Sequence, residues 1–150
     1  MKKIVLFLAA VVVSGLAAED SDACTGISLA ARDGSQVVAR TVEWAATPMQ
    51  CGYVVVPKGH VQQSYTPTGL DGMKYKAKYG YVGIYTEYEP FVVEGVNESG
   101  LSVGLFFFPN YGQYEDYDAE ENYKTICDMQ FVSWALSQFS TIDEVKESVS

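Results

Sequence analysis

The sequence predicts an α+β protein in which antiparallel strands come first and helices follow. Three observations carry this prediction. Short apolar runs separated by turn residues fill residues 25–108, as is typical of antiparallel sheets. Two of the turns, at Asp33-Gly34 and at residues 97–100, have the composition of hairpin turns. From Met129 onward, apolar side chains recur every three or four residues, which is the period of an α-helix.

Residues 1–23 are typical of a secretory signal and are left out of the predicted fold. A pair of lysines gives a positively charged start, and the uncharged run that follows is shorter than the roughly 20 residues of a membrane span. We expect signal peptidase to cleave after the small residue Ala23. Cleavage after Ala17 or Ala18 and a lipid on Cys24 are the alternatives. The mature protein is therefore expected in the periplasm or outside the cell, with no stable membrane anchor.

Composition limits the partners of the protein. The formal net charge is −9 at pH 7, whereas nucleic-acid binding needs clustered Lys and Arg, so we expect no nucleic-acid partner. The single histidine, His60, has no second ligand at metal-binding spacing, and we expect neither a metal nor another cofactor. Of the three cysteines, Cys51 and Cys127 are expected to be unpaired thiols, with a disulfide between them as the alternative.

Strands are expected along most of the chain as far as residue 108. The Asp33-Gly34 turn joins the first two into a hairpin, and the turn at residues 97–100 joins the last two. The run at 61–65 is the expected partner of the run at 53–56. Lys and Tyr alternate at the start of 74–85, so this strand is expected to begin exposed and end buried. The expected strands are 25–31, 36–42, 53–56, 61–65, 74–85, 91–96 and 101–108.

The chain changes character after Pro109. Residues 110–122 are rich in tyrosine and acidic residues and predict an exposed loop, with a mobile lid over a pocket as the functional alternative. Thr141 and Glu144 fit a capping box that begins a second helix through Val149. No Gly or Pro stop signal follows, so we expect the chain to be part of a longer protein. The first helix is predicted by a core-facing stripe of Met129, Val132, Leu136 and Phe139.

Cys24 is the strongest candidate for a catalytic residue. After cleavage behind Ala23, it would carry a thiol and a free α-amine on one residue. The amine has an unperturbed pKa of about 8, so it is a usable general base at neutral pH. This is the arrangement of an N-terminal nucleophile amidase. The alternative is a small apolar cysteine that opens a strand.

Two charged residues are expected beside Cys24 when the Asp33-Gly34 hairpin folds back. Arg40 would stabilise the thiolate, and the carboxylate of Glu43 would orient the amine. The alternative for both is a surface ion pair at a strand end. Asn97, in the second turn, is either a turn former that tolerates left-handed backbone or an N–H donor to an oxyanion.

Aromatic side chains form a further candidate group. They would wall an apolar acyl pocket, although core packing is the usual role of aromatics in strands. The candidates are Trp44, Tyr85, Tyr88, Phe106 and Phe108.

The chain contains, in order, Cys24-Thr25-Gly26, Asp33-Gly34, residues 39–44 (Ala-Arg-Thr-Val-Glu-Trp) and residues 94–101 (Glu-Gly-Val-Asn-Glu-Ser-Gly-Leu). In this combination it resembles the choloylglycine hydrolase family, which comprises bile salt hydrolases and penicillin V acylases of the N-terminal nucleophile fold. The resemblance runs from Cys24 to the end of the chain. It implies an αββα sandwich of antiparallel sheets with flanking helices, and hydrolysis of an unactivated amide through a thioester.

The resemblance also implies roles for single residues. Cys24 would be the nucleophile with its own amine as base, Arg40 the arginine beside the thiol, and Asn97 part of the oxyanion hole. Glu43 stands where many members carry Asp, so its carboxylate reaches one methylene further and its geometry is expected to differ. Because family members are longer, residues 24–150 are expected to be the N-terminal part of a single domain. Members are often homotetramers, which is the expected assembly.

The implied substrate is a small-molecule amide, a bile salt conjugated to glycine or taurine. Within the family, the alternative is a penicillin V or acyl-homoserine-lactone acylase, and Asn97 favours bile salts. Outside the family, the alternative is an exported β-rich binding or envelope protein in which Cys24 is structural or lipidated.

Overall fold

The computed structural model describes residues 24–43, 48–108 and 111–149. The predicted signal segment and Trp44 lie outside these residues. The chain divides into two compact units, Met1–Thr47 and Pro48–Ser150, each of which is considered by itself. Antiparallel strands and short helices make up the described residues, so the α+β prediction is confirmed.

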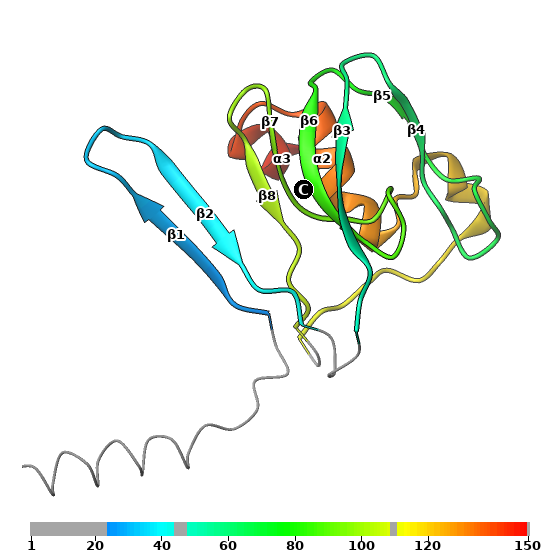
Figure 1. Ribbon diagram of the computed structural model, residues 1–150. Helices are drawn as coiled ribbons and strands as arrows, with labels where there is room; N and C mark the ends of the chain where they lie inside the picture. Colours follow the sequence, from blue (N-terminus) through cyan, green and yellow to red (C-terminus); the bar gives the residue numbers. More distant parts are fainter. Residues whose placement is uncertain (1–23, 44–47, 109–110, 150) are drawn as a thin grey trace, which may run out of the picture. The chain divides into compact units, whose positions relative to one another are not determined.

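The first unit contains the predicted hairpin of β1 (Gly26–Ala30) and β2 (Gln36–Arg40) (Figure 1). The strands are antiparallel, and Gly26 pairs with Arg40. The turn follows from its sequence, because Gly34 has a φ of 87°, which is favourable for glycine. The carboxylate of Asp33 accepts hydrogen bonds from the backbone N–H and the hydroxyl of Ser35, at 3.0 and 2.7 Å. The Asp33-Gly34 prediction is therefore confirmed.

The second unit is built on a four-stranded antiparallel sheet with the strand order β3-β6-β7-β8. Its outer strand β3 pairs with β6, so that Cys51 lies opposite Thr86. The turn between β7 and β8 is the second predicted hairpin, and Gly100 has a φ of 85° there. The strands are β3 (Cys51–Val56), β6 (Tyr81–Thr86), β7 (Val92–Asn97) and β8 (Ser102–Gly104).

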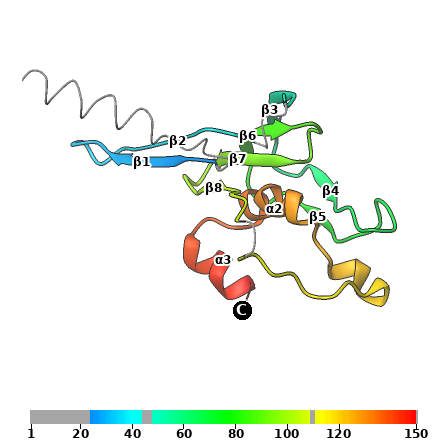
Figure 2. The same cartoon turned by 90° about the horizontal axis from the view of Figure 1, so that it is seen from below.

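The core lies between one face of this sheet and helix α2 (Phe131–Gln138), as Figure 2 shows from below. Val132 and Leu136 are fully buried there, and they contact sheet residues including Val92. The predicted apolar stripe is thus confirmed at its centre, while Met129 and Phe139 at its ends are half-buried. Removal of this apolar surface from water is the main stabilising contribution to the second unit.

A separate two-stranded ribbon corrects the predicted pairing of the run at 61–65. β4 (Val61–Gln63) pairs with β5 (Lys74–Lys76), and not with β3. The predicted strand 74–85 is also divided into β5 and β6. The break occurs because the backbone N–H groups of Lys78 and Tyr79 donate to the carbonyl of Ser137 in α2, at 2.8 and 3.1 Å, and not to a neighbouring strand.

The predicted strand 101–108 is too long, because β8 ends at Gly104. Its partner β7 begins at Val92, and the Phe91 N–H just before it donates to the carbonyl of Tyr88 in the preceding turn, at 2.8 Å. Beyond β8, the Leu105 N–H donates to the carbonyl of Val93 at 2.9 Å. Residues 106–108 lie outside any strand.

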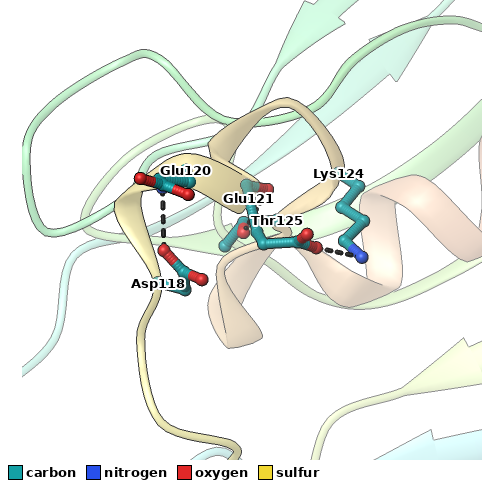
Figure 3. A network of polar contacts seen from close by, with 5 residues as sticks. All are labelled: Asp118, Glu120, Glu121, Lys124 and Thr125. Carbon is teal, nitrogen blue, oxygen red and sulfur yellow. Dashed lines mark hydrogen bonds and ion pairs between the residues drawn. The ribbon is translucent and has the colours of Figure 1, made fainter.

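The acidic strap, residues 111–124, is exposed over residues 111–120 as predicted. Its final part forms a 3-10 helix, η1 (Ala119–Lys124), where only a loop was predicted. Asp118 caps η1 by accepting from the Glu120 N–H at 2.9 Å, and Glu121 forms an ion pair with Lys124 (Figure 3). Acidic residues at the start and a lysine at the end of the helix suit its dipole. A second short 3-10 helix, η2 (Asp128–Gln130), leads into α2.

Helix α3 (Ile142–Ser148) begins with the predicted capping box. The hydroxyl of Thr141 accepts from the Glu144 N–H at 3.2 Å, and the Glu144 carboxylate accepts from the Thr141 N–H at 3.2 Å. Hydrogen bonds from Ser140 also lower the pKa of Glu144.

Replacement of Thr141 by alanine is expected to destabilise α3 by about 1 kcal/mol, because the N–H of Glu144 loses its acceptor. Hydrogen exchange of the α3 amides measures this change. Thr141→Ser keeps the hydroxyl and serves as the control. Equal exchange in the two variants would show that the cap does not stabilise the helix.

Candidate active site

Cys24 lies at the open end of the β1–β2 hairpin. The backbone N–H of Thr41 donates to the carbonyl of Thr25 at 2.9 Å, and the Thr25 N–H donates to the Thr41 hydroxyl at 3.0 Å. These bonds continue the strand pairing up to the residue beside Cys24. The Cys24 thiol is half-buried and donates to the main-chain carbonyl of Glu43 at 3.6 Å. The nucleophile candidate therefore sits on an ordered hairpin end.

Arg40 of β2 lies opposite Gly26 of β1, and Gly26 is two residues after Cys24 in the chain. Paired residues of an antiparallel ladder point to the same face, and alternate residues of one strand share that face. Arg40 therefore shares a face with Gly26. Cys24 would share that face as well if the alternation of β1 continued back to it. The Nε–H of Arg40 donates to the carbonyl of Thr41 at 3.1 Å, which holds the side chain near the hairpin end. The predicted approach of this end of β2 to Cys24 is confirmed by the register.

Glu43 meets Cys24 through its backbone and not through its carboxylate. Its carbonyl accepts the thiol hydrogen bond, and its side chain is half-buried. The amine-orienting role of the carboxylate stays a prediction. Thr41 is the residue that the sequence interpretation missed. The Asp33-Gly34 turn could have identified it, because the same register that pairs Gly26 with Arg40 places Thr41 opposite Thr25.

Asn97 lies at the end of β7 in the second unit and is only 5% exposed. Its Nδ2 group donates to the carbonyls of Leu136 and Phe139, at 2.9 and 2.7 Å. Its Oδ1 accepts from the N–H groups of Ser99 and Leu101, both at 3.0 Å. One buried side chain thus joins the hairpin turn to the C-terminal end of α2.

These contacts change the interpretation of Asn97. The expectation of left-handed backbone is wrong, since Glu87 is the one non-glycine residue with positive φ among those described, and Gly100 takes that conformation in this turn. The backbone N–H of Asn97 also has an acceptor, the carbonyl of Leu101 at 3.0 Å. Its role in an oxyanion hole stays a prediction, and the side chain would have to give up a structural hydrogen bond to serve it.

The candidate aromatic residues lie in different environments. Tyr85 is half-buried and packs against the core, with its ring so close to Gly52 that a Cβ there would lie 2.6 Å from the Tyr85 hydroxyl. Phe106 is half-buried, whereas Phe108 is 66% exposed. Tyr88 packs edge-to-face on Phe91, with ring centroids 5.5 Å apart. Core packing thus accounts for Tyr85, and the pocket role of the other aromatics stays a prediction.

The two remaining cysteines are free thiols, Cys51 exposed on β3 and Cys127 half-buried. Burial raises the pKa of the Cys127 thiol, which disfavours its thiolate form. Within the described ranges, no helix is long and apolar enough to cross a membrane.

Comparison with known proteins gives a family match over residues 24–150, to the family model described as "Linear amide C-N hydrolases, choloylglycine hydrolase family". A protein of Clostridium perfringens named "Bile salt hydrolase/transferase" is 28% identical over 130 residues, which are 84% of this chain and 37% of that protein. A protein of the same name from Bifidobacterium longum subsp. longum is 25% identical over 126 residues, 84% of this chain and 38% of that protein.

A third protein with this name, from Lactiplantibacillus plantarum, is 33% identical over 73 residues, 47% of this chain and 22% of that protein. The chain therefore spans less than two fifths of the length of each of these relatives.

Proposed function

Because the chain belongs to the choloylglycine hydrolase family of linear amide C–N hydrolases, we propose that Cys24 is the nucleophile of an amidase that cleaves conjugated bile salts. One observation carries the proposal. The family match begins at Cys24, the residue that signal cleavage after Ala23 would leave at the N-terminus. Export and this cleavage are part of the proposal, since they create the free α-amine that the reaction needs.

The reaction proceeds in two steps, formation of a thioester on Cys24 and its hydrolysis. The α-amine of Cys24 takes the thiol proton, and the sulfur forms a bond to the amide carbonyl carbon, which gives a tetrahedral oxyanion. The carbon–nitrogen bond then breaks, and the departing amine leaves with the proton from the ammonium group. Water attacks the resulting thioester and releases the acid and the thiol. An amine in place of water would give a new amide, which is in keeping with the "hydrolase/transferase" name of the relatives.

Neighbours of Cys24 on the hairpin have roles in this scheme. The positive charge of Arg40 favours the thiolate, and the carbonyl of Glu43, 3.6 Å from the sulfur, holds the thiol in place before attack. The Glu43 carboxylate orients the α-amine. The fold proposed for the complete protein is the αββα sandwich, to which the two described units would contribute antiparallel strands and helices.

The substrate assignment rests on the relatives, whose names specify bile salts. Glycine and taurine release from conjugated bile salts, compared with phenoxyacetate release from penicillin V, tests it in the protein expressed from its complete gene. Faster release from bile salts, by at least about ten-fold in kcat/KM (a difference of about 1.4 kcal/mol in transition-state binding), is expected. Faster release from penicillin V would reassign the substrate within the same chemistry. Turnover of neither compound, nor of an acyl-homoserine lactone, would favour a non-catalytic exported protein.

A further inference from the structure

The acidic strap depends on a few side chains for its position. Among the residues that the structure describes, no backbone hydrogen bond joins residues 113–117 to the rest of the second unit. The N–H groups of Tyr111 and Gly112 both donate to the carbonyl of Phe108 at 3.2 Å, at the start of the strap. The extended part between Gly112 and η1 therefore has to be held by side chains.

Tyr117 and Asn122 attach the strap to the turn of residues 66–71. The Tyr117 hydroxyl donates to Asn122 Oδ1 at 2.8 Å and lies 3.0 Å from the Thr68 hydroxyl. The Nδ2 group of Asn122 donates to Asp71 Oδ2 at 3.0 Å and to the Thr68 hydroxyl at 3.2 Å.

The centre of this network is the carboxylate of Asp71. It also accepts hydrogen bonds from the hydroxyls of Thr66 and Thr68, which lower the pKa of Asp71 below its ordinary value. Hydrogen bonds to a charged acceptor are stronger than those between neutral groups.

The chain just after the strap is fixed more firmly. The Met73 N–H donates to the carbonyl of Thr125 at 2.9 Å, and the Cys127 N–H donates to the buried hydroxyl of Ser64 at 2.8 Å. A Cβ on Gly72 would lie 2.9 Å from the Thr125 carbonyl, so this close approach requires glycine. The strap thus has a fixed base at Thr125, and its contacts at Tyr117 and Asn122 are exposed.

We propose that Tyr117 and Asn122 form a latch that holds the acidic strap closed on the turn of residues 66–71. The strap opens as a unit between Gly112 and Thr125 while the sheet and α2 stay folded. Exposed segments held by few contacts open at a lower free energy than the core, which is the property that a latch requires. Five acidic side chains of the strap move when it opens: Glu115, Asp116, Asp118, Glu120 and Glu121. The proposal does not depend on the reaction that the protein catalyses.

Hydrogen exchange of the complete protein tests the latch. Tyr117→Phe removes the hydroxyl that contacts Thr68 on the turn and Asn122 within the strap. Exchange in a peptide covering η1 is expected to accelerate about five-fold, as for loss of one ordinary hydrogen bond between the strap and the turn. Tyr123→Phe is the matched control, since Tyr123 lies in the same strap, is 71% exposed and has no hydrogen bond from its hydroxyl among the described residues. The amides of α2 should exchange at the same rate in both variants, which excludes a change in global stability.

Asn122→Ala provides a second variant, with a larger expected acceleration because it removes the bonds to Asp71, Thr68 and Tyr117. The double variant of Tyr117 and Asn122 should exchange more slowly than the product of the two single-variant accelerations predicts, because both residues belong to one network. Equal exchange in Tyr117→Phe and Tyr123→Phe would overturn the latch. A double variant whose acceleration equals the product of the two single accelerations would overturn it as well. So would a wild-type strap whose amides exchange at the rate of an unprotected chain.

Discussion

Cys24→Ser in the complete protein is expected to lower kcat for amide hydrolysis by a factor on the order of 10⁴ or more. A serine hydroxyl is a much weaker nucleophile than a thiol when the only base is an amine with a pKa of about 8. Loss of an essential nucleophile removes most of the catalysis that depends on it. Release of glycine or taurine, followed by amine analysis over long incubation, measures the residual rate.

The matched control for this variant is Cys51→Ser. Cys51 is a free, exposed thiol on β3, so its replacement should leave the rate within about two-fold of the wild type, as is usual for a substitution at an exposed position. Unchanged turnover in Cys24→Ser would contradict the thiol mechanism. Equal losses of kcat in Cys24→Ser and Cys51→Ser would indicate a general effect on folding. That result would also count against the thiol mechanism.

Asn97→Ala is expected to lower the free energy of unfolding by about 3 kcal/mol, the largest effect on stability that we predict. The substitution leaves two carbonyls at the end of α2 and two N–H groups of the hairpin turn without their partner, in a site that is only 5% exposed. Urea unfolding of the complete protein, followed by tryptophan fluorescence, provides the measurement. Trp134 in α2 reports on this region.

Asn122→Ala is the control for the same change of residue type. Asn122 belongs to the exposed network of the acidic strap, so its loss should cost less than about 1 kcal/mol of global stability. Equal effects of the two substitutions would contradict the structural role of Asn97. A variant of Asn97 with normal stability and reduced kcat would instead assign it to the oxyanion hole.

The sequence predicted those parts of the fold whose causes are local. The Asp33-Gly34 turn and the Thr141–Glu144 capping box are each determined by residues a few positions apart, and both are confirmed. The partner of β3 was predicted wrongly, because strand choice depends on packing between distant segments. A short run such as 61–65 carries no signal for whether it joins the main sheet or a separate ribbon.

The same distinction applies to the candidate site. The spacing around the hairpin correctly predicted that the end of β2 lies near Cys24. The contacts of the Asn97 Nδ2 group could not be predicted, since its acceptors at Leu136 and Phe139 are 39 and 42 residues away in the chain. Only the packing of α2 on the sheet brings these groups together. The left-handed conformation expected of Asn97 is taken by Gly100, while the Oδ1 of Asn97 accepts hydrogen bonds within the turn.

The intact mass of the mature protein, recovered from a secreting bacterial host, tests the central claim most directly. The proposed mechanism requires Cys24 at the N-terminus with an unmodified α-amine, because that amine is the general base. We predict a mass that corresponds to a chain beginning at Cys24 with no added group. A mass that corresponds to an earlier first residue, or to a lipid on Cys24, would contradict the mechanism and favour a non-catalytic exported protein.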